Sequence, residues 1–161
     1  MKVKVLGKYG PYPKSGGATS AYLLTSDSAT VAFELGSGAF VRLINSVDVS
    51  DLDAIIISHF HFDHCSDIGV LSYYLLRLSI AGKVKLPVKL YCPECDSPLL
   101  AAFKNMKAFD VITVGDGQEI RLKDLSLRFY SVNHPVPCLG FTACDGARTF
   151  AYGGESNECK N

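Results

Sequence analysis

Residues 54–64 have the sequence Ala-Ile-Ile-Ile-Ser-His-Phe-His-Phe-Asp-His. The continuous apolar run at 54–57 is typical of a strand that is buried on both faces, as in a parallel or mixed sheet. Three imidazoles and a carboxylate follow it directly. Open α/β sheets place their ligand sites at the carboxyl ends of their strands. The segment therefore predicts an α/β or α+β protein with a functional loop at a strand end.

The loop itself predicts a metal site. Imidazole nitrogens suit zinc and its neighbours in the transition series, and a carboxylate can complete or bridge such a site. In an extended segment His59 and His61 point the same way, whereas Asp63 and His64 lie just beyond, where a turn could aim them at a second ion. Surface histidines gathered by chance are the alternative. Three of the four histidines of the chain fall within this loop, which favours the metal site.

Two further features bear on this loop. We expect Phe60 and Phe62 to pack into the core and to stiffen the loop, which lowers the entropy lost when metal binds. The fourth histidine, His134, follows an alternating segment at 125–132 and precedes Pro135. It therefore also lies at a strand end, and we expect it to reach the same pocket.

The remaining pattern alternates strands and helices early and favours antiparallel strands late. Ser66 and Asp67 supply a helix start, followed by apolar residues at helical spacing. Asp145-Gly146 predicts a tight turn. Strands are expected at 1–6, 21–25, 30–35, 52–58, 84–91, 111–114, 125–132, 141–144 and 149–152, and further helices at 40–47 and 97–105.

Composition limits the classes of function. The chain has 161 residues, 48% of them hydrophobic and 20% charged, and its formal net charge is zero. This length fits one domain, 1–161, with a core of its own. A zero charge balance argues against a broad polybasic surface for nucleic acid. No apolar run has membrane-spanning length and the start lacks a secretion signal, so we expect no membrane association and a cytoplasmic location.

The six cysteines are expected to be reduced thiols in that compartment. Cys92-Pro-Glu-Cys95 is a CxxC that could belong to a zinc knuckle or a redox pair. A knuckle would need a second Cys or His pair at suitable spacing, and the sequence offers none. Two ordinary residues at a strand end are the alternative.

The HxHxDH pattern of residues 59–64, with its apolar strand before and Cys65-Ser66-Asp67 after, resembles the signature of the metallo-β-lactamase superfamily. Residues 134–141 and 150–156 are similar to later motifs of the branch that includes ribonuclease Z and related phosphodiesterases. The resemblance implies an αββα sandwich. It further implies that this chain holds the N-terminal sheet-plus-helices half and only the start of the second half.

The resemblance also implies a ligand set of one or two zinc ions per chain, with manganese or iron as alternatives. It assigns one ion to His59, His61 and His134, a second to Asp63 and His64, and a bridging carboxylate to Glu155. Zinc-bound hydroxide would then attack a phosphodiester, since bound water has a pKa of about 7 and two ions roughly 3.5 to 4 Å apart suit in-line attack. Asp63 and Asp67 would be the catalytic carboxylates. Asp67 would handle protons, with a helix N-cap as its alternative role.

Three departures weaken the expectation of an enzyme. The family has Asp where this chain has Glu155, and the extra methylene moves the carboxylate by roughly 1 to 1.5 Å, more than the ~0.5 Å tolerance of a preorganised site. Glu158 is a nearby substitute. The family also has Asp at the position of Glu34, which is either a hydrogen-bonding partner of a ligand His or an exposed strand-end carboxylate.

The third departure is length, because family members continue beyond the equivalent of Asn161 and supply a further metal-binding His. We therefore expect the domain to be C-terminally incomplete, its second metal site to be weak or empty, and one sheet face to expose an apolar patch that a partner must bury. The chain is then a fragment, or a short protein that forms a homodimer to rebuild the sandwich.

Three classes of function remain open from the sequence, and the third of them is an interaction module whose exposed sheet docks a partner. The first is a metal-dependent hydrolase, a phosphodiesterase similar to ribonuclease Z. The second is a catalytically impaired or non-catalytic metal-binding domain that needs a partner chain or its missing C-terminal half. Substrates remain open among RNA ends, cyclic nucleotides or other small-molecule phosphodiesters, thioesters and lactones.

Overall fold

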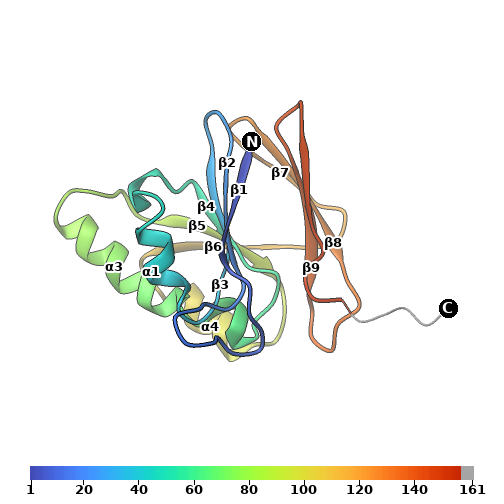
Figure 1. Cartoon of the computed structure of the whole chain (residues 1–161), viewed down its shortest axis with the longest axis horizontal. Coiled ribbons are helices and arrows are strands. Elements are labelled where there is room, and N and C mark those ends of the chain that lie inside the picture. The colour runs from blue at the N-terminus through green and yellow to red at the C-terminus, as the bar shows by residue number, and fades with distance from the viewer. Residues whose placement is uncertain (157–161) are drawn as a thin grey trace.

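The computed structural model describes residues 1–156. Two sheets lie face to face, and the helices cover the outer side of the first sheet (Figure 1). The first sheet has the order β1-β2-β3-β4-β5-β6, and the second has the order β10-β9-β8-β7. The first sheet consists of β1 (Lys2–Gly7), β2 (Ala21–Thr25), β3 (Thr30–Leu35), β4 (Ala54–Ile56), β5 (Val88–Pro93) and β6 (Phe109–Val114).

The first sheet is mixed, as the sequence predicts. Strands β1, β2 and β3 are antiparallel, whereas β3, β4, β5 and β6 are parallel to one another. Parallel strands need crossover connections, and these are helical. The helices are α1 (Ala39–Ile44), η1 (Val49–Asp51), α2 (Phe62–Cys65), α3 (Ile68–Ile80) and α4 (Pro98–Lys104).

Strand β4 is buried on both faces, which is why its sequence is a continuous apolar run. Ile55 packs into the core between the sheet and the helices, and Ile56 packs into the core between the two sheets. The same division applies to β3, where Ala32 faces the helices and Phe33 faces the second sheet. Phe33 stacks on Phe141 with ring centroids 4.5 Å apart, and this contact joins the sheets.

The second sheet is antiparallel and consists of β7 (Glu119–Leu122), β8 (Leu125–Ser131), β9 (Leu139–Cys144) and β10 (Thr149–Tyr152). Its burial alternates, because one face packs on the core and the other does not. Leu125, Leu127 and Phe129 are buried, while the residues between them are exposed. The sequence did not predict β7, whose four residues carry too little pattern to stand out from the flanking turns.

The outward face of this sheet corrects the prediction of an exposed apolar patch. No described helix covers this face (Figure 1). Its central row pairs Arg128 with Thr142 and Thr142 with Ala151, and Arg128 lies 3.7 Å from a carboxylate oxygen of Glu119. Tyr130 hydrogen-bonds Thr142 through its hydroxyl at 3.3 Å. The patch prediction is therefore wrong for the described residues, because small and polar side chains occupy the outward positions.

Among the described residues, no helix has the length and apolar character that crossing a bilayer requires. All five described cysteines are free thiols. Burial raises the pKa of Cys92 to about 12, with a further contribution from Cys95, so this thiol is protonated at neutral pH. Cys92 and Cys95 are not part of the one potential metal-binding group found among the described residues. These observations favour the ordinary strand-end interpretation of the CxxC.

Candidate metal centre

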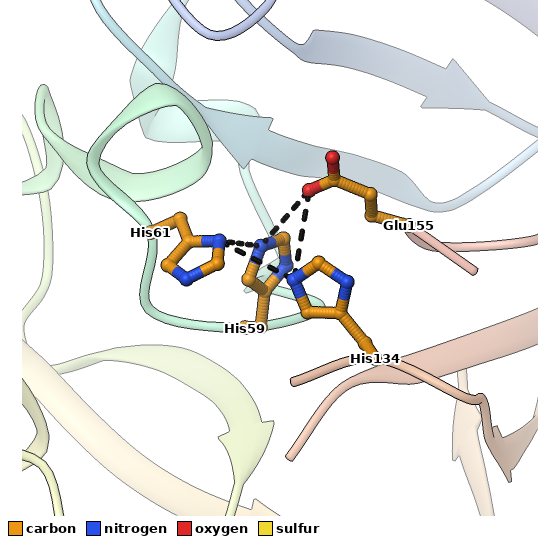
Figure 2. A group of neighbouring side chains, drawn as sticks. All are labelled: His59, His61, His134 and Glu155. Atoms are coloured by element: carbon orange, nitrogen blue, oxygen red, sulfur yellow. Dashed lines mark hydrogen bonds and ion pairs between the residues drawn. The ribbon is translucent and has the colours of Figure 1, made fainter. Parts of the chain in front are cut away.

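Four of the residues predicted from the sequence converge at the carboxyl end of β4. His59 and His61 follow the strand, His134 comes from the loop after β8, and Glu155 comes from the segment after β10. Figure 2 shows their side chains pointing toward one another. One ligand atom from each of the four lies within 4.8 Å of all the others. His134 therefore reaches the His-rich loop, as the sequence predicts.

The separations of these atoms match a tetrahedral ion. Zinc binds imidazole nitrogen at about 2.0–2.1 Å, so neighbouring ligand atoms of a tetrahedron lie about 3.4 Å apart. His61 Nδ1 lies 3.0 Å from His59 Nε2 and 3.3 Å from His134 Nε2. Glu155 Oε2 lies 3.4 Å from His59 Nε2 and 3.7 Å from His134 Nε2. The donor set and these four separations therefore fit a metal ion.

A second group of donors adjoins the first. His64 Nε2 lies 3.6 Å from Asp63 Oδ2 and 3.6 Å from Glu155 Oε2. The same Glu155 oxygen thus faces histidines of both groups, which is the position a bridging carboxylate needs. Three described side chains supply this second group, fewer than the four of the first.

The short helix α2 brings Asp63 and His64 to this position. The chain is extended at His61 and turns into the helix at Phe62, so the period-two alternation of the loop ends there. For this reason the prediction for the two phenylalanines is only half right. Phe60 packs on Phe103 with ring centroids 5.9 Å apart, whereas Phe62 is 69% exposed.

The backbone of the loop at 59–64 makes close contacts that fix its position. A Cβ at Gly36 would lie 1.9 Å from the carbonyl oxygen of Asp63 and 2.0 Å from Thr19 Oγ1. Only a glycine permits so close an approach of the β3 end to α2. The Cys65 thiol donates to the carbonyl oxygen of His61 at 3.2 Å, which closes the turn from the other side.

The second nitrogen of each imidazole decides which nitrogen is free for a ligand. His59 Nδ1 lies 2.9 Å from Ser58 Oγ and 3.6 Å from Cys138 Sγ, so its Nε2 is left for the site. Ser58 and Cys138 were not predicted from the sequence as partners of His59. The position of Ser58 next to the first histidine of the motif was the available signal. His134 Nδ1 is buried without a hydrogen-bond partner among the described residues.

Glu34 is buried, with an exposed fraction of 1%, so the alternative of an exposed strand-end carboxylate is wrong. Its Oε1 accepts a hydrogen bond from the Ser58 backbone N–H at 3.0 Å, and its Oε2 lies 3.4 Å from His64 Nδ1. Its φ of 54° is left-handed, an unusual conformation for a non-glycine residue. Glu34 therefore connects the loop after β4 to a candidate ligand.

The pKa values of His59 and His64 are shifted in opposite directions. Burial, together with the neighbouring imidazoles of His64, His61 and His134, lowers the pKa of His59 to about 3. His59 is therefore neutral at physiological pH, as a metal ligand must be. Burial by itself would lower the pKa of His64, but the adjacent carboxylate of Glu34 and the negative charges of Asp63 and Glu155 outweigh this effect, so the net pKa is raised.

Asp67 stands at the N-cap position of α3, but its side chain does not cap that helix. Its Oδ2 instead accepts a hydrogen bond at 2.9 Å from the backbone N–H of Phe40, in the first turn of α1. Its own N–H donates to the carbonyl oxygen of Leu35 at 3.0 Å. The carboxylate thus ties the start of α3 to the β3–α1 connection. The alternative carboxylate Glu158 lies outside the described residues.

Comparison with known proteins agrees with this fold. The family model described as "Beta-lactamase superfamily domain" matches residues 38–161. The chain belongs to the metallo-β-lactamase superfamily, as the HxHxDH motif predicts, and the α/β fold class predicted from the pattern of strands and helices is confirmed.

Among individual proteins, the chain is 30% identical over 157 residues to "Probable metallo-hydrolase YhfI" of Bacillus subtilis, covering 98% of this chain and 64% of that protein. The crystal structure of YhfI superimposes with a TM-score of 0.88 over 94% of this chain and 61% of that one. Ribonuclease Z of Salinispora arenicola is 29% identical over 154 residues, covering 89% of this chain and 48% of that protein. The short form of human tRNase Z, at 20% identity, shares the fold with a TM-score of 0.70 over 94% of this chain and 68% of that one. The chain thus spans between about half and two thirds of the length of these relatives.

Proposed function

We propose that this chain carries the metal centre of a zinc-dependent hydrolase that cleaves phosphodiesters. The observation that supports the proposal most is the spacing of three imidazole nitrogens and one carboxylate oxygen, 3.0 to 3.7 Å between the measured pairs. A bound ion would activate water and polarise the scissile group. His59, His61, His134 and Glu155 would hold one ion, and Asp63, His64 and Glu155 a second. Manganese or iron would fit the same donors.

Phosphodiesters are the favoured class because of the relatives. Ribonuclease Z is the name of several proteins that match most of this chain, and YhfI is named a metallo-hydrolase. A nucleotide or RNA phosphodiester and a small-molecule phosphodiester both fit the proposal. Activity that needs further chain, or a second copy in a homodimer, would be consistent with the share of the relatives that this chain spans.

Asp63 is proposed as a catalytic carboxylate through its place at the second ion, because its carboxylate lies beside His64. We propose that Asp67 is a positioning residue, which fixes the start of α3 and acts on the site only through that helix. Asp67→Asn tests this distinction, since an amide oxygen can still accept from Phe40 N–H while the charge is lost. A positioning role predicts an unchanged pH dependence of kcat/KM. A direct proton-transfer role predicts that one limb of the pH profile disappears.

The main test is His61→Ala. We expect it to abolish both zinc uptake, measured by equilibrium dialysis, and hydrolysis of bis(p-nitrophenyl) phosphate. Tyr73→Ala, on the exposed face of α3, is the control that should change neither. Hydrolysis that survives His61→Ala would exclude the mechanism. One ion held tightly without turnover, in a protein that melts on chelation, would instead favour a structural metal-binding domain.

A further inference from the structure

A hollow lies directly beside the candidate metal centre. It has a volume of about 370 Å³, within the usual range for small-ligand pockets. Three segments form its wall: the loop after β4, the connection from β5 to α4, and the loop after β8. Its lining residues are Phe60, His61, Cys95, Asp96, Ser97, Pro98, Val136 and Pro137. Because His61 belongs to both sites, the hollow adjoins the metal ligands.

The wall of the hollow is mostly apolar. Phe60, Pro98, Val136 and Pro137 supply hydrocarbon surface, and no Lys or Arg is among the described lining residues. The Phe60 ring is held against Phe103, so this wall is fixed rather than adaptable. The one formal charge besides any on His61 is the carboxylate of Asp96, which is exposed at the edge. Such a surface disfavours a phosphate group and favours a flat uncharged group.

We infer that this hollow receives an aromatic ring, either an aryl group attached through oxygen to the phosphorus that lies at the metal ligands or a nucleobase attached to that phosphorus through its ribose. The inference rests on the proposed function and narrows its substrate to phosphodiesters with a ring next to the scissile phosphate. The ring would lie against Phe60 and Val136. Asp96 and Ser97 would accept or donate hydrogen bonds at its edge, as polar groups at the rim of an apolar pocket commonly do.

Burial of a ring in place of a methyl group gives a measurable difference. Removing apolar area from water contributes roughly 25 cal/mol per Å², so a buried ring should tighten binding about tenfold or more. Phenylphosphonate and methylphosphonate are matched probes, because both present the same anion to the metal ligands. We expect the zinc-loaded protein to bind phenylphosphonate at least tenfold more tightly in isothermal titration calorimetry.

Substitutions at Val136 test whether the preference for phenylphosphonate over methylphosphonate depends on the wall of the hollow. Val136→Asp places a charge in the wall and should reduce the ratio of the two dissociation constants to near one. Val41→Asp makes the same change on the exposed face of α1 and should leave the ratio unchanged. Val136→Ala only shortens the side chain; it should lower the ratio in part, and it keeps the test available if the aspartate variant fails to fold.

The outcomes separate the two proposals. Equal binding of both phosphonates by the zinc-loaded protein, or a ratio that Val136→Asp leaves intact, would overturn the inference alone. A protein that binds zinc but neither phosphonate would overturn the proposed function and this inference with it.

Discussion

Replacing Gly36 with alanine should disturb the metal centre from a distance. The new methyl group would lie 1.9 Å from the carbonyl oxygen of Asp63, so either the β3 end or the α2 turn must move. Extra methyl groups forced into well-packed sites cost about 1–3 kcal/mol, and a clash with backbone on one side places this change near the upper value. The α2 turn carries Asp63 and His64, so we expect a shift of candidate ligands together with the loss of stability.

The two effects have separate magnitudes. For a chain of this size each kcal/mol lowers Tm by about 2–4 °C, so a loss near 3 kcal/mol predicts a fall of roughly 6–12 °C in the metal-free protein. Changes to the residues that support metal ligands typically weaken metal affinity about 10–100-fold. Differential scanning fluorimetry of the metal-free protein and competition with a zinc chelator measure the two quantities.

Gly69→Ala is the matched control. Gly69 lies in α3, and a Cβ there would meet nothing within 4 Å. The substitution should therefore stabilise the protein by about 0.5–1 kcal/mol, because alanine is the better helix former. An unchanged Tm in Gly36→Ala would refute the steric argument. A lowered Tm with unchanged zinc affinity would refute the coupling between this contact and the ligands.

Three other changes test the core, the buried imidazole and the bridging carboxylate. Phe141→Ala removes the ring stacked on Phe33 between the sheets and should destabilise the protein by about 3–5 kcal/mol in urea denaturation. The lowered pKa of His59 means that the unfolded chain, with an imidazole pKa near 6.5, binds a proton before the folded one does. The contribution of His59 is therefore complete above about pH 6.5 and is lost as the pH falls toward 3, so the urea midpoint of the metal-free protein should fall over this range more steeply than that of His59→Asn. Glu155→Asp shortens the carboxylate that lies 3.4 Å from His59 and should weaken zinc binding about tenfold or more in the same chelator competition.

The sequence predicts those parts of the fold in which one segment carries its own pattern. The apolar run of β4 is buried on both faces, and the alternation of β8 matches its two-sided environment. Strand β7 was missed because its place depends on pairing with β8 rather than on its own four residues. The exposed position of Phe62 was missed for a related reason, since the turn into α2 ends the alternation on which the prediction was based.

The same distinction applies to the site. The candidate ligands could be found from their residue types and from the HxHxDH spacing. Of the groups that lie against them, Glu34 was predicted as one of two alternatives, whereas Ser58 and Cys138 were missed; Cys138 comes from a separate segment with no signal of its own. The hollow beside His61 likewise joins three segments, and none of them carries a signal of its own.

Glu155 shows how the backbone and a side chain can change together. The sequence predicts that its extra methylene displaces the carboxylate from a bridging position. In the structure the preceding Gly154 has a φ of 63°, and a Cβ there would lie 2.8 Å from the carbonyl oxygen of Leu139. The chain is thus turned tightly against β9 just before Glu155, and from that point the longer side chain places Oε2 at 3.4 to 3.7 Å from His59, His64 and His134. A side chain one carbon shorter, starting from the same backbone, would stop short of them, so the backbone turn and the length of Glu155 are matched to each other and the substitution is not by itself a lost ligand.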